Sequence, residues 1–337
     1  MIAVMRKDAT QKEIDDVIKY IENHDLKAHP TLGTNRTVIG IIGNIKGIDR
    51  DHLQQMPGVE NAMYLESQIK LASRKFLHDN TVIKVGDVKI GGNEIVVMAG
   101  PCAIESEEQI FETARAVQKA GAKILRASAY KPRTSPYAFQ GMGLEGLKLL
   151  KKVKNELGMV VETEVMDTRQ VETVAKYVDI VRVGARNMQN FDLLKEVGKI
   201  DKPVIIKNGI SATLEEFMLA AEYVMSEGNK QVILCERGIR TFRTETRNTL
   251  DLSAIPVLKE QTHLPVIVDP SHAAGVKQYV MPLSKAAIAV GADGLLVEVH
   301  CDPSQALCDG KQALTTHDFE VLMGDLRKIA AAIGRKI

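Results

Sequence analysis

The chain has 337 residues, of which 45% are hydrophobic and 26% are charged, so it can form one large domain, or one large and one small domain, each with its own core. Forty-four Lys and Arg residues balance 43 Asp and Glu residues, which excludes a global basic field that would hold nucleic acid or an anionic membrane. Apolar runs stay shorter than the ~18 residues of a membrane span, and the first residues do not resemble a signal peptide, so we expect a cytoplasmic protein.

Residues 1–66 are predicted to form a small ferredoxin-like domain. A capping box of Thr10 and Glu13 begins a helix that runs to Asn23, with apolar residues at helical spacing. The predicted elements are a strand over 1–6, a helix over 10–23, strands over 27–32 and 37–43, a short helix over 49–56 and a strand over 59–65. The order βαββαβ occurs in RNA-binding modules and in small-molecule sensors. RNA binding is disfavoured, because only Tyr20 and Tyr64 offer rings on which bases could stack.

Residues 67–93 are predicted to form a connector, with a β-hairpin whose turn is Gly86-Asp87. From Glu94 onward, short strands rich in Val and Ile alternate with amphipathic helices. The predicted strands cover residues 94–100, 122–128, 159–164, 179–185, 203–208, 231–238, 265–270 and 294–300. The predicted helices include 106–120 and 213–227, with capping boxes of Ser106 with Gln109 and of Thr213 with Glu216.

Eight strand–helix units over residues 94–337 have the size and period of a (β/α)8 barrel of the α/β class. A doubly wound sheet is the alternative, but such sheets usually have fewer strands. The first strand is not followed by GxGxxG, so a dinucleotide-binding fold loses its main support.

The four cysteines, at positions 102, 235, 301 and 308, form no CxxC pair, which argues against a zinc ribbon or a thioredoxin-type site. In a reducing cytoplasm we expect free thiols. For each cysteine, buried apolar packing is the alternative to metal ligation.

The active site of such a barrel lies at the carboxyl ends of the strands. A single charged residue there is often merely solvated, but all eight predicted strand ends carry polar or reactive residues, and they converge on one mouth. These residues, with those of the following loops, are Cys102, Arg126, Lys131, Arg133, Thr134, Ser135, Glu162, Glu164, Gly184, Ala185, Arg186, Lys207, Glu236, Arg237, Asp269, His272, Glu298, His300 and Asp309.

Two groups can be separated by their chemistry. A thiol, an imidazole and two carboxylates suit a divalent transition metal better than magnesium or calcium, and they are supplied by Cys102, His272, Glu298 and Asp309. A cationic group would bind multiply charged anions, and two phosphorylated substrates fit it better than one. Its members are Arg126, Lys131, Arg133, Arg186, Lys207 and Arg237.

Long motifs in the chain closely resemble the 3-deoxy-D-arabino-heptulosonate 7-phosphate (DAHP) synthases, in the short beta subtype of the type I class with an N-terminal ferredoxin-like domain. These motifs are GPCAIES, LRASAYKPRTSPYAFQG, VGARNMQNF, IIKNG, ILCERGIRTF, RNTLDLSAIP, PVIVDPSHAAG and EVHCDPSQALCDGKQAL. The resemblance covers residue 94 to the C-terminus through these motifs, and the first 66 residues through topology and position.

The resemblance implies a 3-deoxy-7-phosphoheptulonate synthase. This transferase condenses phosphoenolpyruvate with erythrose 4-phosphate and releases phosphate, as the first step of the shikimate pathway to chorismate and the aromatic amino acids. It also implies one divalent ion per subunit (manganese, iron, cobalt, zinc or cadmium), a homotetramer, and feedback inhibition by an aromatic amino acid bound to the small domains.

Residue by residue, the resemblance makes Cys102, His272, Glu298 and Asp309 the metal ligands. It assigns phosphoenolpyruvate to Arg126, Lys131, Arg186, Lys207 and Arg237, and erythrose 4-phosphate to Arg133, Thr134 and Ser135. We add Gly184, Ala185 and Glu236 to the predicted substrate site, because they lie at the same strand ends. Lys131, Glu164, Cys102 and His272 are the predicted catalytic residues, with Glu164 as the candidate that handles water.

Two alternatives remain open at this point. The related 3-deoxy-D-manno-octulosonate 8-phosphate synthases share the barrel and the chemistry, but their loop after the second strand resembles Lys-Ala-Asn-Arg-Ser. Here that loop is Lys131-Pro132-Arg133-Thr134-Ser135, which favours the four-carbon acceptor. The other alternative is a non-catalytic metal-binding barrel whose small domain acts as a sensor.

Overall fold

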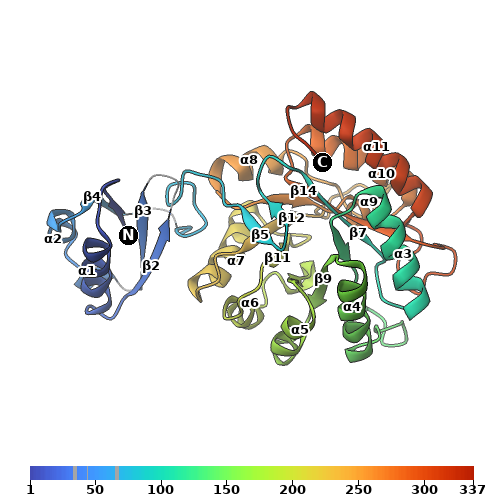
Figure 1. The fold of residues 1–337 in the computed structure, drawn as a ribbon, viewed down its shortest axis with the longest axis horizontal. Helices are drawn as coiled ribbons and strands as arrows, with labels where there is room; N and C mark the ends of the chain where they lie inside the picture. Colours follow the sequence, from blue (N-terminus) through green and yellow to red (C-terminus); the bar gives the residue numbers. More distant parts are fainter. Residues whose placement is uncertain (33–35, 44, 65–67) are drawn as a thin grey trace. The chain divides into compact units, whose positions relative to one another are not determined.

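The computed structural model describes residues 1–32, 36–43, 45–64 and 68–337, which divide into two units (Figure 1). One unit contains residues 1–80 together with 260–263, and the other contains residues 81–259 together with 264–337. The predicted boundary at residues 66 and 67 lies outside the described residues, and the predicted start of the barrel domain at residue 94 stays a prediction.

The smaller unit contains an antiparallel sheet with the strand order β2-β3-β1-β4, which is ferredoxin-like, as predicted. Helix α1 is capped by the predicted box of Thr10 and Glu13, and it buries Val17 and Ile21 against the sheet. The elements are β1 (Ile2–Met5), α1 (Gln11–Glu22), β2 (Lys27–Leu32), β3 (Thr37–Ile42), η1 (Ile45–Gly47), α2 (Arg50–Gln55) and β4 (Val59–Met63). This unit therefore has a hydrophobic core of its own.

The larger unit is a closed barrel of eight parallel strands, because β13 pairs with both β12 and β14. The short strand β15 (Leu314–Thr315) adds to β14 outside the barrel. The barrel strands are β7 (Val96–Gly100), β8 (Ile124–Arg126), β9 (Val160–Val165), β10 (Ile180–Val183), β11 (Val204–Lys207), β12 (Val232–Glu236), β13 (Val266–Val268) and β14 (Gly294–His300). The predicted (β/α)8 fold is thus confirmed.

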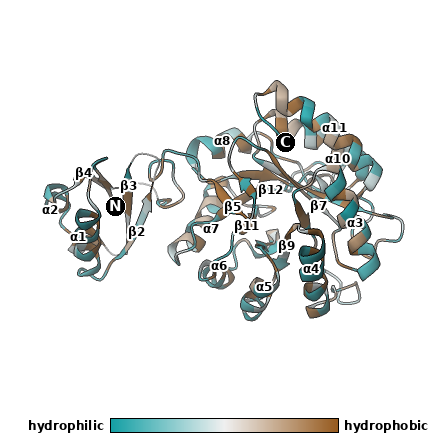
Figure 2. Cartoon of the chain, in the orientation of Figure 1, coloured by the Kyte–Doolittle hydropathy of each residue, from teal (hydrophilic) through white to brown (hydrophobic). Residues whose placement is uncertain are grey.

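Helices surround the strands, and colouring by hydropathy shows an apolar β7 and a largely hydrophilic α4 (Figure 2). The helical elements are α3 (Glu107–Ala120), α4 (Leu144–Leu157), η2 (Thr168–Gln170), α5 (Val171–Tyr177), η3 (Ala185–Asn187), α6 (Phe191–Gly198), α7 (Leu214–Ser226), α8 (Ala254–Gln261), α9 (Pro270–Ala274), α10 (Lys277–Ala289) and α11 (Thr316–Ala332).

The predicted capping boxes differ in how completely they form. At α7, Thr213 and Glu216 bond each other's backbone N–H in both directions. At α3, Ser106 accepts from Gln109 N, but the Gln109 side chain bonds Glu105 N and Ala103 O rather than the cap residue. The box at Ser106 is therefore only half formed, because Gln109 holds the preceding loop instead.

A hairpin of β5 (Ile83–Val85) and β6 (Val88–Ile90) packs against one end of the barrel. Ile83, Val85 and Ile90 form a hydrophobic cluster with residues near the amino ends of the barrel strands, such as Val96 and Ile124. The end opposite the predicted active site is therefore filled by apolar side chains.

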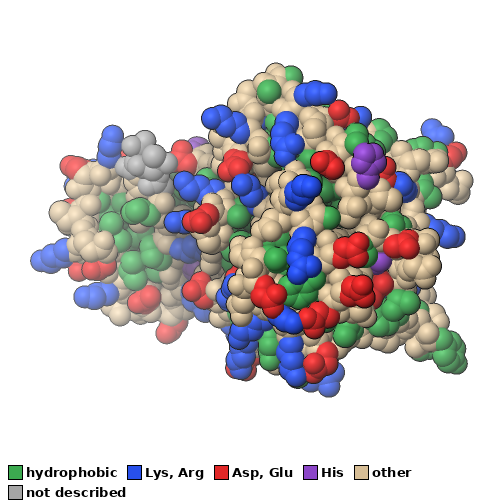
Figure 3. Space-filling model, turned by 45° about the vertical axis from the view of Figure 1, so that its right-hand side comes forward, with side chains coloured by type: hydrophobic (Ala, Val, Ile, Leu, Met, Phe, Trp, Pro, Cys, Tyr) green, Lys and Arg blue, Asp and Glu red, His purple; other side chains and the backbone are tan. Residues whose placement is uncertain are grey.

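Lys and Arg side chains are interspersed with Asp and Glu side chains on the face shown in Figure 3. None of the helices in the described ranges combines the length and the apolar character that a membrane span requires.

Candidate active site

A cavity of about 300 Å³ lies at the carboxyl ends of the barrel strands. Seven cationic side chains and only two carboxylates line it, so the cavity suits an anion. The charged lining residues are Lys131, Arg133, Arg182, Arg186, Lys207, Arg237 and Arg247, with Glu164 and Asp309.

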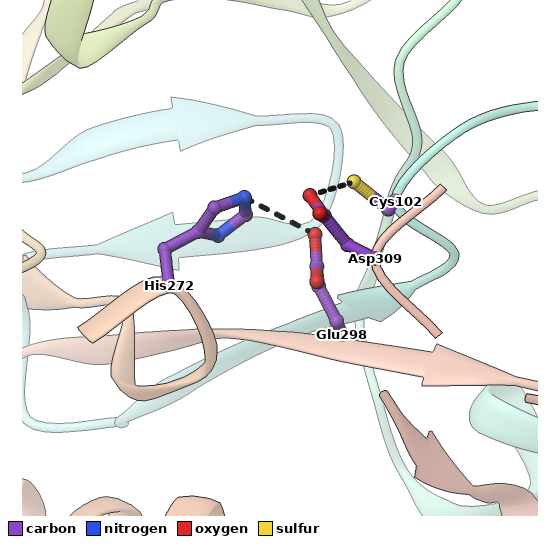
Figure 4. A group of neighbouring side chains, drawn as sticks. All are labelled: Cys102, His272, Glu298 and Asp309. Atoms are coloured by element: carbon purple, nitrogen blue, oxygen red, sulfur yellow. Dashed lines mark hydrogen bonds and ion pairs between the residues drawn. The ribbon is translucent and has the colours of Figure 1, made fainter. Parts of the chain in front are cut away.

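Four predicted ligands converge beside this cavity (Figure 4). One ligand atom from each of Cys102, His272, Glu298 and Asp309 lies within 4.8 Å of the others. Cys102 follows β7, His272 lies on α9, Glu298 lies in β14, and Asp309 lies in the loop after β14. The set of one sulfur, one imidazole nitrogen and two carboxylate oxygens fits a divalent transition metal.

The orientation of His272 is fixed by a buried carboxylate. Asp269 accepts a hydrogen bond from His272 Nδ1 at 2.7 Å, and Lys207 Nζ also donates to Asp269. His272 Nε2 then faces Glu298 Oε1 at 3.3 Å. Burial lowers the pKa of His272 to about 4, so the imidazole is neutral at pH 7, which is the form that binds a metal.

Glu298 is held from both sides. Arg126 Nη1 donates to its Oε1 at 3.2 Å, and Gln312 Nε2 donates to its Oε2 at 2.5 Å. Burial alone would raise the pKa of Glu298, but the neighbouring cationic groups, Arg126 among them, outweigh burial and lower it. Nε and Nη2 of the buried Arg126 find no hydrogen-bond partner among the described residues, so its guanidinium retains two donors for a bound anion.

Cys102 lies among a second thiol and a lysine. Its Sγ is 3.3 Å from Cys308 Sγ and 2.9 Å from Lys131 Nζ, and Arg133 donates to Cys308. Burial raises the pKa of the Cys102 thiol well above its ordinary value. Metal binding by Cys102 would therefore release a proton.

Glu164 projects into the cavity near Arg182, with Oε2 3.7 Å from Arg182 Nη1. Burial would raise its pKa, but Arg182 and Lys131 lower it, so Glu164 is a carboxylate at neutral pH. Arg182 is itself fixed by Glu162, at 2.6 Å, and by Ser128.

The structure brings most of the predicted site residues together. The predicted residues that line the cavity are Lys131, Arg133, Thr134, Ser135, Glu164, Gly184, Ala185, Arg186, Lys207, Arg237, His272 and Asp309. Cys102, Glu298 and Arg126 are buried and join the cavity through the contacts above. Glu236 is not among the lining residues: its carboxylate accepts from Asn208 Nδ2 at 2.8 Å and from Gly238 N at 2.7 Å.

Sequence reasoning missed three residues of this site, namely Arg182, Arg247 and Gln312, and it placed Asp269 at the mouth without giving it a role. A charge inside the apolar strand IVRV could have marked Arg182 as half of a buried ion pair. Asp269 stands three residues before His272, where it caps α9, and this spacing was a usable signal. We find no sequence signal for Arg247 or Gln312.

The fold and the site together define a barrel enzyme in which four side chains that could hold a metal ion lie beside a cavity rich in cations. Residues 68–332 match the DAHP synthetase I family, and residues 1–67 match the DAHP synthase ferredoxin-like domain. The chain belongs to this family, whose members depend on a metal.

Similar proteins agree with this assignment. The chain is 48% identical to the phospho-2-dehydro-3-deoxyheptonate aldolase of Thermotoga maritima, over the full length of both. A crystal structure of a Thermotoga maritima DAHP synthase superposes with a TM-score of 0.79 at 47% identity, covering 99% of this chain and 98% of that one. A truncated form of that synthase covers 80% of this chain and 99% of its own, with a TM-score of 0.76.

The two alternatives left open by the sequence lose their support here. The 2-dehydro-3-deoxyphosphooctonate aldolase of Geobacter sulfurreducens, a protein of the octulosonate class, is 34% identical over 270 residues, which cover 74% of this chain and 98% of the aldolase. This match is more distant and only partial. The 48% identity to the Thermotoga maritima aldolase extends over the full length of both chains. A non-catalytic barrel is therefore no longer expected.

Proposed function

We propose that this cavity condenses phosphoenolpyruvate with erythrose 4-phosphate and releases phosphate, which is the DAHP synthase activity of the family. The observation that carries the proposal is the placement of the metal-binding group next to a cavity rich in cations. Two phosphorylated reactants need cations, and the aldehyde of the sugar needs an electrophilic partner.

Cys102, His272, Glu298 and Asp309 are proposed to hold one divalent metal ion. When bound, such an ion supplies Lewis-acid polarisation of a carbonyl oxygen. The mixed donor set accepts manganese, iron, cobalt, zinc or cadmium, and it gives the softer ions a thiolate. Asp269 and Gln312 would orient two of the ligands.

The deeper cations are proposed to bind phosphoenolpyruvate. Lys207 and Arg126 are 3% and 0% exposed, and Arg126 retains free donors. Arg186 and Arg237 line the same cavity, and Lys131 lies between the cavity and Cys102. A phosphate and a carboxylate would be neutralised there by cations that are already fixed in place.

The outer loop is proposed to bind erythrose 4-phosphate. Arg133, Thr134 and Ser135 follow β8 at the rim, where Thr134 and Ser135 are exposed and can offer hydroxyl donors to a phosphate. This arrangement would place the aldehyde end of the sugar toward the metal group. Holding both reactants would lower the barrier by up to about 7–11 kcal/mol in favourable cases.

The proposed reaction forms a carbon–carbon bond between C3 of phosphoenolpyruvate and the aldehyde carbon. The former aldehyde oxygen takes up a proton and becomes a hydroxyl group, while positive character develops at C2. Water adds at C2, and the carbon–oxygen bond to phosphate then breaks as C2 becomes a ketone. Glu164 is proposed to take the proton of that water, because Arg182 and Lys131 keep it ionised. Lys131 is proposed to neutralise the oxygen charges that develop nearby.

The decisive experiment measures phosphate released from phosphoenolpyruvate, with and without erythrose 4-phosphate, in the metal-loaded full chain. A five-carbon sugar phosphate serves as the competing acceptor. Release that depends on the four-carbon sugar supports the proposal. Preference for the five-carbon acceptor, or release without any acceptor, would contradict it.

We also propose that the small unit regulates the barrel by binding an aromatic amino acid within a homotetramer in the cytoplasm. Two observations support a separate role for this unit. It has a hydrophobic core of its own, and the predicted catalytic residues all lie in the larger unit. Inhibition would require that the amino acid bind one arrangement of the units more tightly than another.

A further inference from the structure

The loop over residues 301–313 carries the metal-ligand candidate Asp309. Its two ends are pinned next to each other, because β14 and β15 pair through Val299 with Leu314 and through His300 with Thr315. The loop between these ends has no strand or helix, so its shape depends on contacts made by individual residues.

The conformation at Asp309 requires such support. Asp309 has a φ of 54°, a left-handed conformation that is uncommon for a residue with a side chain. A Cβ at the next residue, Gly310, would lie 2.3 Å from Pro303 O, so the loop doubles back tightly against itself. Strained backbone of this kind persists only where surrounding contacts hold it.

Glu105, in the loop before α3, contacts this segment at two points. Its Oε1 accepts from Leu307 N at 2.9 Å, and its Oε2 is 3.4 Å from His300 Nε2. His300 Nδ1 accepts from Asp302 N at 3.0 Å, which leaves the ring proton on Nε2 to be donated to Glu105. The Glu105 side chain is 9% exposed, and its backbone N–H bonds Gln109.

We propose that Glu105 is a positioning residue for metal binding, which it supports by holding the loop that presents Asp309. Within the described part of the chain, no hydrogen bond or ion pair joins Glu105 to any of the four ligands, so it acts through the backbone of Leu307 and through His300. The inference rests on the metal site of the proposed function. Glu105, in the loop before α3, would thus be a further residue on which the metal affinity depends.

The test titrates cobalt(II) into the metal-free full chain and follows the thiolate-to-cobalt absorption of Cys102. In Glu105→Gln, a single carbonyl oxygen replaces the two carboxylate oxygens that accept from Leu307 N and His300 Nε2. The new NH₂ group then faces one of these two donors and cannot accept from it. We expect metal affinity to fall about 10- to 100-fold, the usual effect of losing a supporting contact. Glu108→Gln, on the exposed side of the same helix start, is the matched control and should bind like the wild type.

A double-mutant cycle shows whether Glu105 acts through Asp309. In an Asp309→Ala background, Glu105→Gln should cause no further loss of cobalt affinity. An equal loss in both backgrounds, or unchanged affinity in Glu105→Gln alone, would overturn the inference. His300→Leu removes one donor and keeps Glu105, and it should show a smaller loss in the same direction.

Two further results separate the possible failures. If the wild-type chain binds no cobalt through Cys102, the metal site itself is wrong, and the inference about Glu105 falls with it. If the wild type binds and the variant binds equally well, only the inference fails. Thermal unfolding of the metal-free variants shows that each is folded before titration.

Discussion

The carboxylate of Glu164 occupies the space that a side chain at Gly184 would need. A Cβ built at residue 184 would lie 2.1 Å from Glu164 Oε1, far inside any real contact distance. β9 and β10 pair in parallel with Glu164 beside Arg182, so the glycine follows directly after the strand that supplies the cation. The missing side chain is thus a condition for placing the proposed base.

Gly184→Ala should therefore displace the Glu164 carboxylate while the barrel stays folded. We expect kcat to fall about 100-fold, the lower range for losing a general base, with little change in metal affinity. Steady-state kinetics and a cobalt titration measure the two quantities. Gly324→Ala, where nothing lies within 4 Å of a new Cβ, is the control. Wild-type kcat in Gly184→Ala would exclude Glu164 from the chemistry.

Cys102→Ala should remove the sulfur ligand and most of the metal affinity. Because the other three ligands are oxygen and nitrogen donors, we expect the loss to be largest for soft ions such as cadmium. Activity should fall by about 100-fold or more, and a chelator should inactivate the wild type until a divalent metal is returned. Cys301→Ala is the control. Full activity of metal-free wild type, verified by elemental analysis, would contradict the metal site.

Arg133→Ala and Lys207→Met should affect different substrates. Arg133→Ala removes the guanidinium at the rim and should raise KM for erythrose 4-phosphate about 10-fold or more. Lys207→Met removes the ammonium group deep in the cavity and should raise KM for phosphoenolpyruvate by a similar factor. The comparison of the two Michaelis constants in each variant is the measurement. Equal changes in both constants would show that the cavity is not divided as proposed.

His263 makes the stability of the smaller unit depend on pH. Burial lowers its pKa to about 4, and its Nε2 donates to Leu71 O at 2.7 Å. Between about pH 6.5 and pH 4 the unfolded chain binds a proton that the folded chain does not, so stability falls as the pH falls through this range. The loss approaches about 3 kcal/mol at pH 4.

The measurement for His263 is the thermal unfolding temperature at pH 7 and at pH 5. His263→Gln can still donate to Leu71 O but cannot be protonated, so the gap between the two temperatures should narrow. His317→Gln, at an exposed position, is the control and should keep the wild-type gap. An unchanged gap in His263→Gln would refute this source of acid sensitivity.

Deletion of residues 1–66 should leave the condensation active and remove inhibition. The predicted catalytic residues lie in the larger unit, so the shortened chain retains the cavity. Activity assays of both chains with tyrosine, phenylalanine and tryptophan measure the effect. If the full chain ignores all three, and chorismate and prephenate as well, the regulatory proposal fails and the synthase assignment stands.

The sequence predicted the elements well where short-range chemistry determines them. The Thr10 and Thr213 capping boxes mark real helix starts, and the apolar strand runs mark the barrel. Strand ends also predicted which side chains converge, since parallel strands meet at one rim. Contacts that depend on three-dimensional packing were not predictable. The Gln109 side chain turns to Glu105 rather than to Ser106, and Gln312 reaches Glu298 from a loop.

The same limit explains Glu236 and Arg182. Both are charged residues in apolar strands, but the sequence analysis assigned Glu236 to the substrate site and missed Arg182. In the structure Glu236 bonds the turn at Gly238, whereas Arg182 points among Glu162, Glu164 and Ser128 inside the cavity wall. The direction in which each side chain points therefore decides that Glu236 has a structural role and that Arg182 lies beside the proposed base, Glu164.

The hairpin of β5 and β6 covers the end of the barrel opposite the cavity. Its apolar side chains fill the end opposite the cavity, so both reactants, the product and the released phosphate must pass the same rim. Lys207 and Arg126 lie deep, whereas Thr134 and Ser135 are exposed at the entrance. On the proposed division of the cavity, the molecule held by the deep cations would enter before the sugar phosphate and would leave only after it.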